Sequence, residues 1–227
     1  LGLAIVSDRF DTLIIDLQSR QLKKRINGRP VCYNSQDHIL FTHDIYLYEV
    51  ELLSHQVRVI YCLNSNQNLN FSRVVESLKY IAAFAADRIL LFKKGESKSV
   101  ASYQHTENIS ACFLSHDSSY LFVTSNERLY AYSLPSFSAE WEMDLYNSYT
   151  SIYSFNHILL VRQKEGSYSA VDISNGGILY DFGRCYVNHI DCCSELDQFA
   201  LSNQSGSEIQ VYQVYKRQIR LLYTINI

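Results

Sequence analysis

A strand-like pattern recurs along this sequence about every 40 residues, and a period of this length restricts the chain to a few repeat folds. Each repeat contains an apolar run with one central residue, called here its anchor residue. The runs are LIIDL (13–17), IYLYE (45–49), ILLFK (89–93), LYAYS (129–133), YSAVD (168–172) and IQVYQ (209–213). The anchor residues are Ile15, Tyr48, Phe92, Tyr132, Val171 and Tyr212. They are spaced by 33, 44, 40, 39 and 41 residues, the repeat length of a four-stranded sheet.

Further short strands are predicted around each anchor residue. An apolar run precedes it, a polar turn and another strand follow it, and every repeat except the first opens with one strand more. The polar breaks suit hairpins, and the runs are too short for helices of ordinary length. Sheets repeated in this way solve the edge problem by packing on their neighbours. The sequence therefore predicts an all-β fold, a β-propeller of about six four-stranded blades whose first blade lacks its innermost strand.

The predicted blades together form one domain over residues 1–227. They span residues 1–28, 29–63, 70–104, 108–145, 149–183 and 187–227. A truncated seven-bladed propeller is the alternative. The chain begins at Leu1 rather than Met, so we expect it to be a fragment. The missing first strand leaves an edge near Leu1–Ser7 that is open to strand addition by a partner.

The fourth repeat contains the only Trp of the chain, in the run SAEWEM (138–143). Strand alternation points Ala139, Trp141 and Met143 to one side and the two intervening glutamates to the other. Large aromatic side chains are mostly buried. We therefore expect Trp141 to pack between two blades.

Charge and composition exclude several classes of protein. The 227 residues carry a net charge of −3, without the strong basic excess of a nucleic-acid-binding domain, and no run of 18 apolar residues predicts a membrane span. Tyr (18) and Phe (11) are abundant, which suits half-buried strands. None of the six cysteines forms a C-x-x-C pair, so no zinc site is predicted. Buried, reduced thiols indicate a cytoplasmic or nuclear protein.

Residues 104–134, QHTENISACFLSHDSSYLFVTSNERLYAYSL, resemble a WD40 repeat. His105 stands where the Gly-His dipeptide of that family ends, and Ser115-His116-Asp117 resembles its Ser-Pro-Asp turn. Thr124, Asn126 and Tyr132 stand where the family places Ser, Asp and Trp. The resemblance implies a hydrogen-bonded tetrad of His105, Thr124, Asn126 and Tyr132. The fifth repeat also resembles other propeller families, including those that bind quinone cofactors, but the polar groups that such a cofactor requires are not found.

No catalytic residue, metal ligand or cofactor is predicted. Ser115, His116 and Asp117 are adjacent in a turn and cannot adopt the geometry of a catalytic triad. The segment KKGESKS (93–99) lacks the spacing of a phosphate-binding loop. His38 and His43 lie at opposite ends of one predicted strand, too far apart to share a metal ion.

The turns between the second and third strands of the repeats, called here b–c turns, carry the candidate binding residues. Asp87-Arg88 and Glu127-Arg128 align at equivalent positions, and Arg9 and Lys164 occupy nearby ones. In a propeller these turns share one face. Two interpretations stay open: each cation pairs with its adjacent acid or with solvent, or the arginines bind an acidic peptide or a phosphate.

The resemblance to WD40 proteins implies a non-catalytic scaffold that binds other protein subunits of a multiprotein complex. Three alternatives remain. The first is a binding subunit of an RNA-processing or RNA-modifying complex, with a basic face; nucleic-acid binding is less favoured because of the overall charge. The second is an enzyme that uses the central channel. The third is an incomplete propeller that a partner completes.

Overall fold

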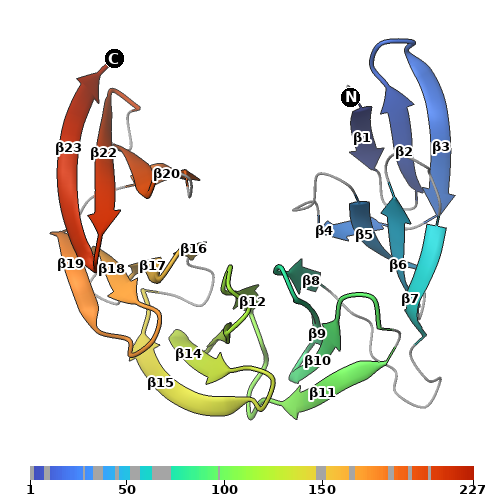
Figure 1. The fold of residues 1–227 in the computed structure, drawn as a ribbon, viewed down its shortest axis with the longest axis horizontal. Helices are drawn as coiled ribbons and strands as arrows, with labels where there is room; N and C mark the ends of the chain where they lie inside the picture. The colour runs from blue at the N-terminus through green and yellow to red at the C-terminus, as the bar shows by residue number, and fades with distance from the viewer. Residues whose placement is uncertain are drawn as a thin grey trace. The chain divides into compact units, whose positions relative to one another are not determined.

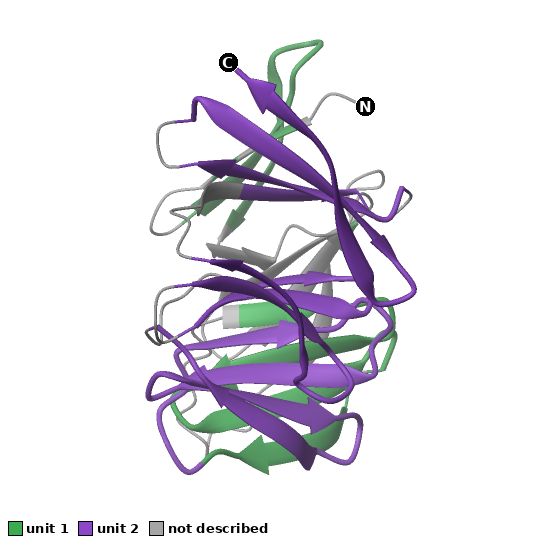
Figure 2. Ribbon diagram, turned by 90° about the vertical axis from the view of Figure 1, so that its left-hand side faces the viewer, with its two compact units in different colours: residues 1–105 green, residues 106–227 purple. Residues whose placement is uncertain are grey.

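The computed structural model describes 13 segments of the chain, separated by short gaps. They are residues 3–7, 11–27, 29–32, 38–43, 46–51, 57–62, 73–96, 98–146, 152–163, 167–183, 187–193, 196–203 and 206–227. All regular secondary structure in these segments is β-strand. The chain divides into two compact units, Leu1–His105 and Thr106–Ile227, shown in green and purple in Figure 2. Each unit is described here by itself.

The first unit contains three antiparallel sheets, each made of strands that are consecutive in the sequence (Figure 1). The first has three strands, β1 (Leu3–Ser7), β2 (Asp11–Asp16) and β3 (Gln21–Asn27). The second has four, β4 (Arg29–Cys32), β5 (His38–His43), β6 (Tyr46–Glu51) and β7 (Val57–Cys62). The third has four, β8 (Arg73–Glu76), β9 (Tyr80–Ala85), β10 (Arg88–Lys93) and β11 (Ser99–Gln104).

The second unit contains three four-stranded antiparallel sheets of the same order. The fourth sheet of the chain has β12 (Ala111–Leu114), β13 (Tyr120–Ser125), β14 (Arg128–Ser133) and β15 (Ser138–Asp144). The fifth has β16 (Tyr153–Phe155), β17 (Ile158–Arg162), β18 (Tyr168–Asp172) and β19 (Ile178–Gly183). The sixth has β20 (Val187–Cys193), β21 (Gln198–Asn203), β22 (Glu208–Tyr215) and β23 (Gln218–Asn226).

A β-bulge marks the same place in every sheet. The pairing between the outer strand and the strand before it shifts register immediately before the anchor residue. The shifts lie at Ile14/Ile15, Leu47/Tyr48, Leu91/Phe92, Ala131/Tyr132, Ala170/Val171 and Val211/Tyr212. A bulge increases the local twist of a strand. The period read from the sequence is therefore also the period of a backbone feature.

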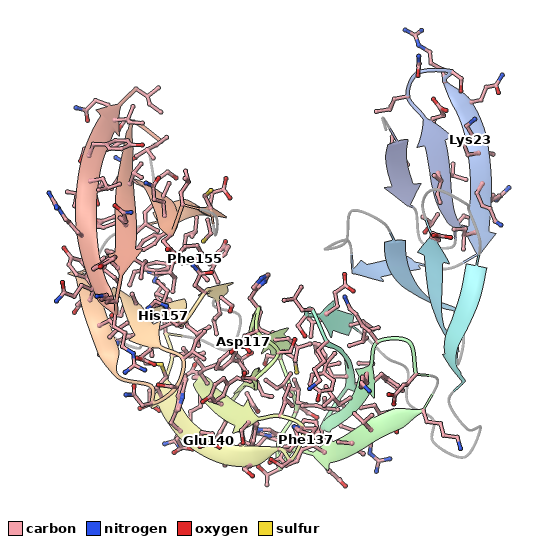
Figure 3. All side chains as sticks on the ribbon, viewed as in Figure 1. Lys23, Asp117, Phe137, Glu140, Phe155 and His157 are labelled. Carbon is pink, nitrogen blue, oxygen red and sulfur yellow. The ribbon has the colours of Figure 1, made fainter. Side chains whose placement is uncertain are left out.

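The middle strands form the core because both of their faces are covered. In β9 every residue is buried, and Ile89–Phe92 of β10 are buried as well. In the second unit, one apolar cluster joins the fourth and fifth sheets through Phe122, Ala131, Leu159 and Val171, among others. Another joins the fifth and sixth sheets and includes Phe155, labelled in Figure 3. Neighbouring sheets of this unit thus pack face to face.

Trp141 packs between two sheets, as predicted. Its half-buried ring lies against the cluster that joins the fourth and fifth sheets. Glu142 and Glu140, the latter labelled in Figure 3, are exposed. The prediction that Ala139 points with Trp141 is wrong. Trp141 pairs with Ala131 but Ala139 pairs with Tyr132, because the bulge falls between them, and Ala139 is exposed.

The predicted all-β fold of repeated four-stranded sheets is confirmed, and so is the three-stranded first sheet. The described residues include no helix that could span a membrane. The prediction of a single domain stays a prediction.

Candidate functional site

In the fourth sheet, the b–c turn and the segment that follows the outer strand lie at the same edge. In the fourth sheet the Leu145 amide donates to the Glu127 carbonyl oxygen at 2.7 Å. The Tyr146 amide then donates to the carbonyl oxygen of Arg162 in the fifth sheet at 3.1 Å. We call this edge the b–c edge. Its polar residues are Glu107, Glu127, Arg128, Tyr130, Glu142, Asp144, Tyr146 and Arg162.

Arg128 is held between two carboxylates of the outer strand. Its Nη1 lies 2.9 Å from Glu142 Oε1 and its Nε lies 3.2 Å from Asp144 Oδ1. Strand pairing explains this arrangement, since Arg128 lies opposite Asp144 and Tyr130 lies opposite Glu142. The two acids, Glu142 first, raise the pKa of the Arg128 guanidinium. Arg128 is thus fixed by strand-borne acids rather than by the adjacent Glu127.

Tyr130 lies beside this group of charges. Partial burial, followed by the carboxylates of Glu107 and Glu142, raises the pKa of its phenol above the ordinary value. Glu107 is fixed in turn, because the hydroxyl of the buried Ser125 lies 3.0 Å from Glu107 Oε2. The raised pKa extends the pH range over which the phenol keeps its proton.

Arg162 lies over an aromatic ring on the same edge. Its Cζ is 4.1 Å from the centroid of the Tyr146 ring and 5.9 Å from that of the buried Tyr168. Tyr146 is 45 % exposed. The guanidinium of Arg162 therefore contacts the Tyr146 ring while part of the ring stays in contact with solvent. This pair was not predicted from the sequence. Tyr146 follows the outer strand of one sheet and Arg162 ends the second strand of the next, so only the packing of the two sheets brings them together.

The described part of the b–c edge carries charges of both signs. Among the described residues of the second unit, the carboxylates of Glu107, Glu127, Glu142 and Asp144 outnumber the guanidinium groups of Arg128 and Arg162. A phosphate approaching Arg128 would meet the carboxylates of Glu142 and Asp144, which already contact its Nη1 and Nε. The geometry suits a protein partner with its own mixed charges better than it suits a polyanion.

The equivalent turn of the first unit is built differently. Asp87 Oδ2 accepts a hydrogen bond from Gln104 Nε2 at 3.1 Å, and its carbonyl oxygen accepts one from the His105 amide at 2.6 Å. Arg88 is half-buried and forms no ion pair with the part of the chain that the structure describes. Arg9 and Lys164 lie outside the described residues, so the predicted group of four cations stays a prediction.

The comparisons with solved structures concern the fold. A chain of a structure entitled "Crystal Structure of Mitotic Checkpoint Complex" aligns with a TM-score of 0.66 at 6% identity, covering 100% of this chain and 77% of that one. Hsv2 of Kluyveromyces lactis aligns with a TM-score of 0.58 at 11% identity, over 94% of this chain and 71% of that one. BamB of Moraxella catarrhalis aligns with a TM-score of 0.59 at 9% identity, over 100% of this chain and 73% of that one.

The chain shares with these structures a β-propeller fold of repeated four-stranded antiparallel sheets. No protein-family model matches the sequence, and no curated protein matches it at a significant level. The similarity is therefore one of architecture, carried by the repeated sheets and not by shared residues.

The residues of the predicted WD40-like tetrad occupy the following places in this propeller. Thr124 is buried, and its hydroxyl lies 3.4 Å from the Ala111 carbonyl oxygen. Asn126 is exposed in the b–c turn with a φ of 45°, and Glu127 follows with 61°, as a two-residue hairpin turn requires. Tyr132 is buried on β14. His105 is buried at the end of the first unit, so the tetrad spans the division between the units and stays a prediction.

Ser115, His116 and Asp117 form a turn, as predicted. The Ser115 hydroxyl donates to Asp117 Oδ1 at 2.6 Å, and the Ser119 hydroxyl donates to Asp117 Oδ2 at 2.7 Å. Asp117, labelled in Figure 3, thereby closes the hairpin between β12 and β13. Within the described segments no group of three His, Cys, Asp or Glu side chains could hold a metal ion.

Proposed function

We propose that this propeller is a non-catalytic scaffold that binds a protein partner through the b–c edge of its second unit. The observation that carries the proposal is the Arg162–Tyr146 pair, which holds an exposed aromatic ring beside a network of fixed charges. Tyrosine and arginine dominate the binding energy of protein interfaces, particularly when they are held rigidly.

The comparisons support this proposal through the architecture alone. One of the aligned chains comes from a structure named as a complex, and the fold serves many functions. The site supports the proposal, because contacts within the chain already orient Arg128 and Arg162. A preorganised edge loses little side-chain entropy on binding.

An RNA-processing or RNA-modifying complex is the second candidate, with the chain binding another subunit of that complex. A direct contact with phosphate through Arg128 is less favoured, because Glu142 and Asp144 flank this residue. Salt dependence separates the two modes of binding, since phosphate contacts release counterions and weaken steeply as salt rises.

Co-purification of the full-length protein from the cells that make it, with mass spectrometry, tests the proposal. We expect a stoichiometric protein partner that is retained by the wild type and lost or depleted with Tyr146→Ala. Tyr215→Ala is the matched control. Tyr215 is 65 % exposed and has Lys216 Nζ at 5.2 Å from its ring centroid, but it lies at the opposite edge of the sixth sheet. Equal partner recovery with Tyr146→Ala and Tyr215→Ala would contradict the proposal, as would an isolated monomer in a preparation that preserves complexes.

A further inference from the structure

The turn between β18 and β19 (Figure 1) contains Asn175-Gly176, one of the two Asn-Gly pairs of the chain. The other pair is Asn27-Gly28. In such a pair the backbone nitrogen of the glycine is able to attack the side-chain amide carbon of the asparagine, because the glycine has no Cβ atom that shields this nitrogen. Asn175 is exposed. The turn therefore carries both groups that a spontaneous deamidation requires.

This reaction uses water as its only other reactant. The Gly176 nitrogen loses its proton to solvent and bonds to Asn175 Cγ. The bond between Cγ and Nδ2 then breaks, and ammonia leaves. Water opens the resulting succinimide at either of its two carbonyl groups. One product has aspartate at position 175, and the other has isoaspartate, whose main chain runs through Cγ and is longer by a CH₂ group.

Two hydrogen bonds of the turn act on this reaction in opposite directions. The Gly177 amide donates to Asn175 Oδ1 at 2.8 Å. A donor at this oxygen polarises the carbonyl group and stabilises the negative charge that develops during attack, as in an oxyanion hole. The Gly176 amide donates to the Asp172 carbonyl oxygen at 2.9 Å. This second bond retains the proton that the nitrogen must lose before it attacks.

Trp141 holds Gly176 in this position. A Cβ atom added at Gly176 would lie 2.8 Å from Cδ2 and 2.9 Å from Cε3 of the indole, so the ring lies against the backbone. The indole Nε1 also donates to the Ile173 carbonyl oxygen at 2.9 Å, so the ring contacts the turn before and after Asn175. Rotation of Gly176 towards the Asn175 side chain therefore separates it from the indole. Attack requires the turn to open locally.

We propose that Asn175 is a deamidation site and that opening of the turn away from Trp141 sets its rate. The Gly176 nitrogen has to be released before it reacts, whereas the bond from Gly177 activates only the carbonyl group that is attacked. That bond lies within residues 175–177 and does not depend on Trp141, so the carbonyl group stays activated when the turn opens. The longer main chain of the isoaspartate product does not fit the closed turn, so the modified turn stays open.

Incubation of the full-length protein at mildly alkaline pH, followed by peptide mass spectrometry, provides the first test. We expect Asn175 to deamidate at least about tenfold more slowly in native buffer than in concentrated urea. In urea, the Asn27-Gly28 pair supplies the reference rate of an unfolded Asn-Gly pair. Equal rates at Asn175 in native buffer and in urea would overturn the proposal, as would the absence of deamidation at Asn175 in urea.

Variants of Trp141 test whether this turn, and not the whole fold, has to open. Trp141→Ala should raise the rate at Asn175 in native buffer by about tenfold and leave the rate in urea unchanged. Trp141→Phe, which loses the hydrogen bond but keeps most of the packing, should raise the native rate less. Phe84→Ala is the matched control, because it removes a buried ring from the first unit and should change the native rate by less than about twofold. Equal acceleration by Trp141→Ala and Phe84→Ala, or no acceleration by either Trp141 variant, would overturn the proposal.

Fluorescence of the deamidated protein provides the second test, and neither test requires a binding partner. Trp141 is the only Trp of the chain, so its emission reports on the turn. Ion exchange separates the deamidated forms by their added negative charge. We expect the isoaspartate form to emit at longer wavelength and to be quenched more strongly by acrylamide than the wild type. Asn175→Asp is the control, because it adds the same charge without lengthening the main chain, and it should keep the emission of the wild type. Identical emission and quenching of the isoaspartate form and the wild type would overturn the proposal that the modified turn stays open.

Discussion

Trp141 of the fourth sheet donates a hydrogen bond of 2.9 Å to the carbonyl oxygen of Ile173 in the fifth sheet. The same indole lies above Gly176, which has a φ of +70° and leaves no space for a Cβ atom. One side chain thus joins two sheets through a hydrogen bond, through apolar packing and through close approach to the backbone.

Replacing Trp141 should separate these contributions. Trp141→Phe keeps most of the ring packing but removes the donor, so we expect a loss of about 1 kcal/mol in the free energy of unfolding. Trp141→Ala also removes the packing and should cost about 3 kcal/mol. Urea unfolding measures both. Equal stabilities of Trp141→Phe and the wild type would show that the hydrogen bond does not stabilise the interface between the fourth and fifth sheets.

Gly176→Ala tests the close approach. The new methyl group would press on the indole, and the positive φ adds strain. We therefore expect the free energy of unfolding to fall by about 2–3 kcal/mol. Gly95→Ala is the matched control, because Gly95 has a φ of +85° with nothing within 4 Å of an added Cβ. The free energy of unfolding of Gly95→Ala should fall by only about 1 kcal/mol, the cost of a left-handed backbone conformation for a residue with a Cβ atom. Similar decreases in the free energy of unfolding for Gly176→Ala and Gly95→Ala would argue against close packing of Gly176 on the Trp141 indole.

Arg217→Met should destabilise the contact between the fifth and sixth sheets. Arg217 Nε lies 3.0 Å from Asp172 Oδ2, and the Asp172 side chain is only 3% exposed. Removing the cation leaves a buried carboxylate whose remaining donor is Ser174. Because Arg217 itself is 59% exposed, solvent screens the pair, and we expect a loss of about 1–2 kcal/mol.

The control for this pair is Lys93→Met. Lys93 Nζ lies 2.7 Å from Glu96 Oε1, but both partners are about half exposed. We expect urea midpoints of Lys93→Met and wild type to coincide. An equally small effect of Arg217→Met would mean that water replaces the guanidinium at Asp172.

The strand order and the repeat were predictable because the signal is local. Strands such as β9 are buried on both faces, so their sequence, YIAAFA, is continuously apolar. Each anchor residue follows a bulge, which ties the sequence period to backbone geometry. Identification of short polar breaks as hairpins required only turn chemistry.

The charge contacts were less predictable because they depend on register between strands. Sequence adjacency suggested Glu127 as the partner of Arg128, yet antiparallel pairing brings Glu142 and Asp144 to it. The sheet face on which Ala139 lies was predicted wrongly, because strict alternation of side chains along a strand ignores the bulge between Ala139 and Trp141. The Arg162–Tyr146 pair joins two sheets and has no signal in either repeat alone.

The turn at Asp117 should make stability depend on pH. Burial opposes ionisation of this carboxyl group, but hydrogen bonds from Ser115 and Ser119 outweigh it and lower its pKa below the usual 3.8. A lowered pKa in the folded state stabilises the protein above about pH 4, and this contribution is lost as the pH falls through the folded-state pKa. Asp117→Asn should therefore be less stable than wild type at pH 6, with the difference narrowing towards pH 2.5.

Urea midpoints measured from pH 2.5 to 7 check this dependence. Glu140→Gln is the control, because Glu140 is an exposed carboxylate on the outer strand (Figure 3). We expect the urea midpoint of Glu140→Gln to change with pH in the same way as that of the wild type. A constant difference between Asp117→Asn and wild type across the range would rule out ionisation of Asp117 as the cause.

Thiol alkylation should distinguish the described cysteines by burial. Burial raises the pKa of the Cys112 thiol well above its ordinary value, and burial, with a smaller contribution from Asp191, raises that of Cys192 to about 11. Cys193 is exposed, so its thiolate is the accessible one. At pH 8 we expect iodoacetamide to modify Cys193 first, Cys192 slowly and Cys112 only after unfolding in urea. Peptide mass spectrometry reports each site, and Cys193→Ser should remove the fast phase of these three sites. Rapid modification of Cys112 in the native protein would contradict the packing of β12 against β13.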